Sequence, residues 1–294
     1  MICFVLRLTF RNFVGEMDYS INVRGRLLDF SEPRVMGILN VTPDSFYADS
    51  RQQTKAEIAR RAAQIVAEGA DIIDIGACST RPGSQPATEA EETERLRLAL
   101  DIVRREQPDA VVSVDTFRPD VAAMAVKDFG VDIINDVYPS TEMFRMVSRL
   151  RVPYIVMSSK PTLREMLLEF AEWVQLLRDF GQKDIILDPG FGFGKTLEEN
   201  YTVLQDMERL QVMKLPVLVG VSRKSMIWRL LGTSPEEALN GTTVLNTVAL
   251  QKGANILRVH DVHEAVECVK IVQQINWTRA SCLASDQRSS GSLV

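Results

Sequence analysis

The sequence has few of the residues that build metal cages or disulfide frameworks. Among its 294 residues are two histidines and four cysteines. The histidines are His260 and His263, and the cysteines are scattered from Cys3 to Cys282 with no metal-ligand spacing. We therefore expect no zinc-type site and no disulfide framework. Reduced thiols, and so a cytoplasmic protein, are the simplest expectation.

Long apolar runs and strong positive charge are also lacking. No run reaches the roughly 18 residues that a membrane helix needs, and the first twenty residues lack the apolar core and cleavage site of a signal peptide. The net charge of −5 argues against nucleic acid or an anionic membrane as a partner. A site for an anionic ligand would have to be locally basic.

Familiar catalytic loops are missing as well. The sequence contains no GxSxG elbow, no GxxxxGK[ST] phosphate loop and no GxGxxG fingerprint. A serine-nucleophile hydrolase and a nucleotide-binding fold of these common types are thus not indicated.

Short apolar, β-branched runs recur at regular intervals along the chain. Nearly continuous apolar runs of this length are typical of parallel strands buried on both faces, and each run is followed by a helical candidate. Eight such units over roughly 240 residues predict a single-domain α/β fold, a (β/α)8 TIM barrel. An open doubly wound sheet is the alternative, since sequence cannot show closure. The runs are residues 35–40, 70–76, 110–115, 131–135, 152–157, 183–188, 216–221 and 255–260.

The barrel is expected to occupy residues 35–276. Residues 18–34 alternate as an N-terminal strand or hairpin would, and residues 1–17 form an extension of uncertain status, with Met17 as an alternative start. Residues 277–294 lack periodicity and predict a flexible tail. The weakest helical pattern lies between the fourth and fifth runs, in "VYPSTEMFRMVSRL".

Polar residues gather where the predicted strands end. In a barrel, the carboxyl ends of the strands form the rim that carries the active site. Each residue alone could equally cap a helix or begin a loop, but their convergence on one rim favours a site. The residues are Asn40, Asp74, Asp115, Asn135, Asp188, Ser222, Lys224, Arg258 and His260. His263 is expected on a helix surface.

The loops after these strands add further polar and glycine-rich motifs. "STRPG" carries Arg81, which is suited to bidentate contact with phosphate or carboxylate. In "GVSRKS", Lys224 and Ser225 are expected to open a helix whose N–H groups attract an anion. The stretch "DPGFGFGK" at residues 188–195 places three glycines, two phenylalanines, an acid and a lysine together. A plain loop does not need this composition, which suggests a ligand.

Seven motifs taken together resemble the dihydropteroate synthase family, the folate-pathway enzymes that sulfonamides target. They occur in the family's order over roughly residues 21–275: "GILNVTPDSF", "DIIDIGACSTRPG", "VVSVDT", "DIIND", "DIILDPGFGFGKT", "VGVSRKS" and "RVHDV". The resemblance implies condensation of 6-hydroxymethyl-7,8-dihydropterin diphosphate with 4-aminobenzoate, giving 7,8-dihydropteroate and diphosphate. It also implies a dissociative (SN1-like) mechanism, Mg²⁺ as cofactor, and a homodimer.

The resemblance further implies roles for individual residues, listed here by ligand. The pterin is assigned Asp115, Asn135, Met157, Asp188, Phe193, Gly220 and Lys224. The diphosphate is assigned Asn40, Arg258 and His260, with Asn40 also at the metal. The aminobenzoate is assigned Phe46, Thr80, Arg81, Pro82, Phe193, Lys224 and Ser225. The catalytic set is Asn40, Asp115, Lys224, Arg258 and His260.

The chain departs from the family pattern in three places. "GACSTRPG" puts Ala77 and Cys78 where the family often has "GGESTRPG", and we expect Cys78 to be a buried, inert thiol. "YADS" replaces the family's "SDGG", and "MSSKPT" precedes a shortened connection after the fifth strand. A pterin-binding paralogue without activity, a folate-dependent methyltransferase and a non-catalytic interaction protein remain alternatives. "STRPG" and "SRKS" argue against the paralogue, "NVTPDSF" and "STRPG" argue against the methyltransferase, and an interaction protein would not explain the polar residues at the rim.

Overall fold

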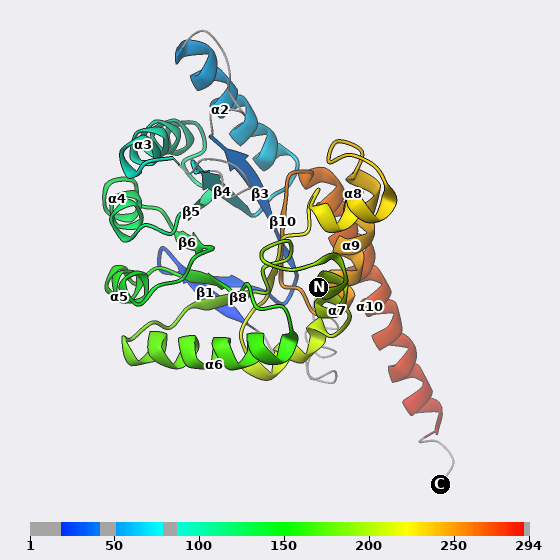
Figure 1. Cartoon of the computed structure of the whole chain (residues 1–294). Coiled ribbons are helices and arrows are strands. Elements are labelled where there is room, and N and C mark those ends of the chain that lie inside the picture. The colour runs from blue at the N-terminus through cyan, green and yellow to red at the C-terminus, as the bar shows by residue number, and fades with distance from the viewer. Residues whose placement is uncertain (1–18, 42–50, 79–86, 291–294) are drawn as a thin grey trace.

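Eight parallel strands form the centre of the molecule, and the predicted barrel is confirmed (Figure 1). The computed structural model describes residues 19–41, 51–78 and 87–290. The strand order is β8-β7-β6-β5-β4-β3-β10-β9. A parallel bridge between Leu187 and Val217 joins the two ends of this order, and Leu187 N donates to Pro216 O over 2.9 Å. The open-sheet alternative is therefore excluded.

Each predicted apolar run overlaps one strand, and helices follow on the outside. The strands are β3 (Arg34–Asn40), β4 (Ile72–Gly76), β5 (Val111–Asp115), β6 (Ile133–Asp136), β7 (Tyr154–Met157), β8 (Ile185–Asp188), β9 (Leu218–Val219) and β10 (Ile256–Val259). The helices are α2 (Arg51–Ala67), α3 (Glu89–Glu106), α4 (Pro119–Phe129), α5 (Thr141–Leu150), α6 (Leu163–Asp179), α7 (Leu197–Gln205), the 3-10 helix η2 (Met207–Met213), α8 (Ser225–Leu231), α9 (Leu239–Gln251) and α10 (Val262–Ser290).

Local sequence explains the weakest predicted helix, α5. Ser140 precedes it in an extended conformation, and its side chain accepts a hydrogen bond from Met143 N over 3.1 Å. Met143, Phe144 and Val147 then point into the core between the helices and the strands. The cap and this buried stripe are enough to form a ten-residue helix.

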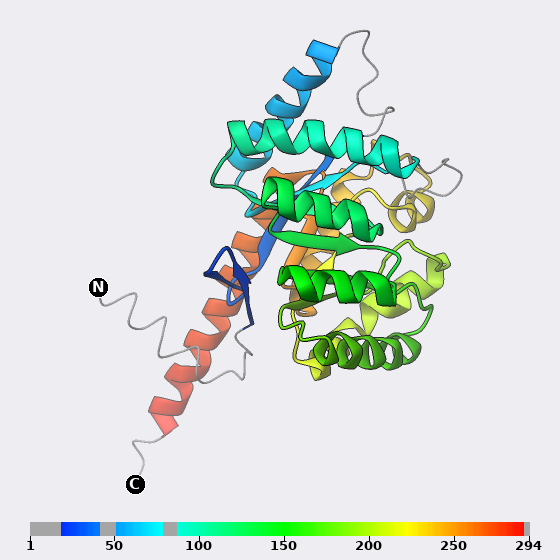
Figure 2. The same ribbon diagram turned by 90° about the vertical axis from the view of Figure 1, so that its left-hand side faces the viewer.

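An apolar layer closes the amino-terminal end of the barrel interior. Every strand contributes one residue to it: Met36, Ile72, Val111, Ile133, Ile155, Ile186, Leu218 and Ile256. The hairpin of β1 (Ser20–Val23) and β2 (Arg26–Asp29) packs Ile21, Val23 and Phe30 against this floor. Figure 2 shows the hairpin in dark blue, beside the end of the barrel where the strands begin. In the described part of the chain, this packing covers the amino-terminal end of the barrel interior.

The chain beyond residue 276 differs from the expected flexible tail. Helix α10 continues to Ser290, the red helix of Figure 1. Thr278 Oγ1 donates to Gln274 O over 2.9 Å within it. The lack of an apolar stripe was misleading, because residues 262–290 contain no proline or glycine to end the helix. Of the helices in the described ranges, none combines the length and apolar character of a membrane span.

Candidate functional site

Strand alternation places polar side chains directly above the apolar floor. Successive inward positions on a strand are two residues apart. The positions two residues beyond the floor are Ile38, Asp74, Ser113, Asn135, Met157, Asp188, Gly220 and Arg258. One step further come Asn40 and Asp115, and strand pairing sets Gly76 opposite both of them. Asp115 is in turn opposite Asn135, and Met157 opposite Asp188. The fold therefore gathers most of the predicted site at one mouth.

Arg258 lies at the centre of a partly buried charge network. Its Nε donates to Asp74 Oδ2 over 2.6 Å, and its Nη2 donates to Asp115 Oδ2 over 2.7 Å. Burial disfavours the guanidinium charge, but Asp74 and Asp115 outweigh it and raise the pKa of Arg258. Asn135 Nδ2 also donates to Asp74 Oδ2, over 3.2 Å. Asp74, which sequence reasoning saw at the rim but gave no role, thus joins Arg258 to Asn135.

Asp188 is buried and Asp115 is partly buried, and this removal from water raises the pKa of both carboxyl groups. Burial raises the pKa of Asp115 to about 7, against the attraction of Arg258. Burial also raises the pKa of Asp188, opposed by Lys224 and by Gly190 N, which donates to Asp188 Oδ1 over 2.7 Å. Perturbed carboxylates that lie close enough to interact, as Asp115 and Asp188 do, are typical of a functional site.

Three polar atoms of this layer lack a hydrogen-bond partner within the part of the chain that the structure describes. They are Asp74 Oδ1, Ser113 Oγ and Asn135 Oδ1, and all are buried. A buried polar atom without a partner costs about 1–3 kcal/mol, so native proteins rarely keep several together. Their clustering indicates a ligand that brings hydrogen-bond donors.

The "DPGFGFGK" loop forms one wall of the mouth. Lys224 Nζ donates to Phe191 O and lies 4.6 Å from the centroid of the Phe193 ring. Burial lowers the pKa of Lys224 to about 8. Gly190 has φ of 61°, and a Cβ there would collide with the carbonyl oxygen of Ser158. The glycine is needed because two loops meet backbone to backbone.

The "GVSRKS" segment supplies the start of α8 and a partner for His260. Lys224 caps α8 and Ser225 is its first residue, as predicted. Ser222 Oγ lies 3.0 Å from His260 Nδ1 and accepts from His260 N over 3.1 Å. His263 lies on the surface of α10, where it pairs with Glu267 over 3.3 Å. The two histidines are therefore separated as expected.

Part of the predicted site lies outside the described residues, namely Phe46, Thr80, Arg81 and Pro82. Cys78 is half-buried, so the expectation of a fully buried thiol is wrong; it follows β4 at the edge of the described chain. Within the described ranges, no group of three histidine, cysteine or acidic side chains could hold a metal ion.

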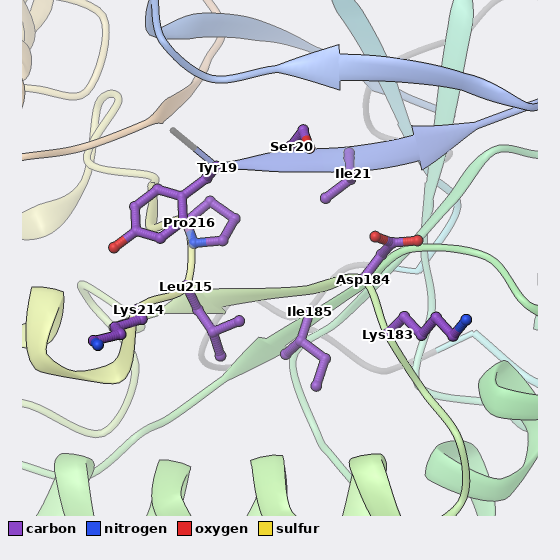
Figure 3. Close-up of a pocket in the computed structure, with 9 residues that line it drawn as sticks. All are labelled: Tyr19, Ser20, Ile21, Lys183, Asp184, Ile185, Lys214, Leu215 and Pro216. Atoms are coloured by element: carbon purple, nitrogen blue, oxygen red, sulfur yellow. The ribbon is translucent and has the colours of Figure 1, made fainter. Parts of the chain in front are cut away.

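A small pocket of about 220 Å³ lies at the other end of the barrel (Figure 3). It lies between the hairpin and the segments that precede β8 and β9. It is therefore distant from the mouth. Its lining residues are Tyr19, Ser20, Ile21, Lys183, Asp184, Ile185, Lys214, Leu215 and Pro216. None of the predicted site residues takes part in it.

The chain is similar in sequence to known proteins of one family. The family model described as "Pterin binding enzyme" matches residues 36–260. Dihydropteroate synthase of Escherichia coli strain K12 is 36% identical over 267 residues, covering 85% of this chain and 94% of that protein. The Bacillus subtilis enzyme of the same name is 36% identical over 264 residues, covering 86% and 92%.

Solved structures agree with these relatives. Xanthomonas albilineans dihydropteroate synthase, solved with 4-aminobenzoic acid, superposes with a TM-score of 0.82 at 34% identity and covers 88% of this chain and 98% of its own. The Coxiella burnetii enzyme, solved with pteroic acid, gives 0.77 at 36% identity, with coverage of 87% and 98%. The sequence matches and the fold matches over the whole barrel agree with each other. The chain therefore belongs to the pterin-binding enzyme family as a dihydropteroate synthase, a transferase of folate biosynthesis.

Proposed function

We propose that the protein joins 6-hydroxymethyl-7,8-dihydropterin diphosphate to 4-aminobenzoate at the mouth of the barrel. The observation that carries the proposal is the set of buried, unpartnered oxygens on Asp74, Ser113 and Asn135 above an apolar floor. A flat heterocycle with several N–H groups suits this arrangement, because it can satisfy those oxygens while its ring rests on apolar side chains.

The pterin would be read by Asp115, Asn135, Asp188 and Lys224. The two carboxylates accept from ring N–H and amino groups, with Asp188 at the guanidine-like edge, while Lys224 donates to a ring carbonyl or nitrogen. Met157 is buried opposite Asp188 and would pack against the ring. A Cβ at Gly220 would meet Arg258 only at 3.8 Å, so the protein alone does not require glycine there. This leaves space for a ligand beside the backbone.

The diphosphate would lie between Asn40, Arg258 and His260. Arg258 is held by Asp74 and Asp115, and His260 by Ser222, so both groups are oriented before the substrate arrives. The donor chemistry of Asn40, an amide oxygen at the end of β3, fits Mg²⁺, which usually takes one or two protein oxygens and keeps substrate phosphates and water as its other ligands. When bound, the ion would neutralise charge on the leaving diphosphate.

The second substrate would bind beside the pterin. Ser225 and the first N–H groups of α8 face the carboxylate, and Phe193 with the Lys224 stem borders the ring. In the dissociative mechanism, departure of diphosphate leaves a cation stabilised by the pterin, and the neutral aniline nitrogen attacks it.

The test is a coupled diphosphate-release assay on the purified protein with Mg²⁺ and both substrates. We expect release that depends on aminobenzoate, loss of activity with a chelator, and competition between aminobenzoate and a sulfonamide. A related Yersinia pestis enzyme was solved in complex with a sulfonamide drug. Pterin binding without aminobenzoate-dependent turnover would instead identify the inactive paralogue.

We also propose a homodimer and a cytoplasmic location. Val244 on α9 and Ile271 and Ile275 on α10 are exposed apolar residues, and these two helices pack side by side, so this surface could bury itself against a second copy. Light scattering at the mass of one chain would refute the dimer. Cys78 and Cys268 are free thiols, in keeping with a reducing compartment.

A further inference from the structure

Lys195, the last residue of "DPGFGFGK", has a complete set of protein partners. Its Nζ donates to Gly190 O over 3.0 Å, to Ser158 O over 3.2 Å and to Phe193 O over 3.3 Å. An ammonium group has three N–H donors, so all of them are used. This lysine therefore holds the protein itself rather than a ligand.

The three carbonyl groups belong to two loops that rise from neighbouring strands. Ser158 directly follows Met157 at the end of β7, whereas Gly190 and Phe193 lie in the loop after β8. Backbone contact between Gly190 and Ser158 brings these loops together at one point. Lys195 binds them at a second point, which also fixes Phe193.

The loop has further anchors near Phe193. Phe193 N donates to Gly190 O over 3.1 Å, and Lys224 Nζ donates to Phe191 O. Asn200 Oδ1 accepts from Gly192 N over 2.7 Å, and its Nδ2 donates to Thr196 O over 2.6 Å. Asn200 thus holds Gly192 and Thr196, whereas the carbonyl oxygen of Phe193 accepts from Lys195 Nζ. Burial lowers the pKa of Lys195 to about 8, as expected for an ammonium removed from bulk water.

We propose that Lys195 is a positioning residue that acts through Phe193, holding its ring against Lys224 so that the aminobenzoate pocket is formed before binding. The inference rests on the proposed function, in which Phe193 is a ring wall shared by both substrates. Without the ammonium, the carbonyl of Phe193 would lose its bond to the neighbouring loop, so the segment that carries the ring would be held less firmly. The substrate would then have to complete its ordering, and this would weaken binding.

The test compares Lys195→Met with Lys183→Met. Lys183 is an exposed lysine that precedes β8, at the end of the strand opposite to the loop that Lys195 holds. We expect Lys195→Met to raise the KM for aminobenzoate about tenfold with a smaller change in kcat, as loss of hydrogen bonds from a charged group predicts. Hydrogen–deuterium exchange of residues 189–194 should accelerate in this variant alone. Lys195→Arg keeps the positive charge but cannot donate to all three carbonyl groups in the same geometry. Its KM and exchange rate should lie between those of Lys195→Met and the wild type.

A double-mutant cycle with Phe193→Ala separates positioning from general stabilisation. If Lys195 acts through Phe193, adding Lys195→Met to Phe193→Ala should change the KM less than twofold, whereas independent effects multiply. Multiplicative effects, or exchange equal to that of Lys183→Met, would overturn the proposal; should Lys195→Met fail to fold, Lys195→Arg carries both measurements. An inactive wild-type protein would reject the proposed function, while the exchange data would still decide whether Lys195 holds the loop.

Discussion

Replacement of Asp188 by asparagine tests the pterin site most directly. Asp188 is 8% exposed, and its Oδ1 already accepts from Gly190 N over 2.7 Å. Asparagine can keep that bond with its carbonyl oxygen, so the loop should stay folded. The remaining carboxylate oxygen, however, becomes an NH₂ group that faces the donors of the pterin.

The expected loss follows from two contributions. A hydrogen bond to a charged group contributes ~1.5–3 kcal/mol, and leaving a buried donor without a partner costs ~1–3 kcal/mol. Together they predict a loss of roughly 3–4 kcal/mol, which raises the Kd for the pterin by about two to three orders of magnitude. Solvent screens little of this interaction energy, since the Asp188 carboxylate lies inside the barrel and not on its surface.

The assay is calorimetric titration of the pterin substrate into the two proteins. Asp184→Asn is the matched control, because Asp184 immediately precedes the same strand at its amino-terminal end, away from the mouth. The control should bind normally, and both variants should unfold near the wild-type Tm. A Kd for Asp188→Asn within about fivefold of wild type would refute the assignment of Asp188 to the pterin.

Three further outcomes are expected. Ser225→Ala should raise the KM for aminobenzoate about tenfold through loss of one charge-assisted hydrogen bond and leave the pterin Kd unchanged; an equal loss of both affinities would contradict the separation of the two pockets. The pH profile of kcat/KM should be bell-shaped: it falls below pH about 7 as Asp115 gains a proton and loses an acceptor, and above pH about 8 as Lys224 loses a proton and a donor. A flat profile across this range would refute it. Asp74→Asn should lower the free energy of unfolding by ~1–3 kcal/mol in chemical denaturation, because the partly buried Arg258 loses one of the two carboxylates that it bonds; unchanged stability would show that Asp74 is not needed for that charge.

Much of the fold and mouth could be predicted from local pattern. Each strand lies in a short apolar run, and the composition of such a run predicts that it is buried, whatever it packs against. Asp115, Asn135 and Asp188 stand near the carboxyl ends of theirs, so closing the barrel brings them together. Local sequence also predicted that α8 starts at Ser225 and that His263 lies on the surface.

Tertiary structure decided which charges pair and which loops join. Asp74 and Arg258 are 184 positions apart, and only ring closure shows that this carboxylate, buried with one unpartnered oxygen, binds the arginine. The partners of Lys195 are backbone carbonyls, which carry no side-chain signature in the sequence. The hairpin of residues 20–29 was predicted, but its packing against the far end of the barrel was not, and the helical extension of α10 to Ser290 was also missed. Periodicity reports whether a segment is buried, whereas partner choice depends on the distances that closure creates.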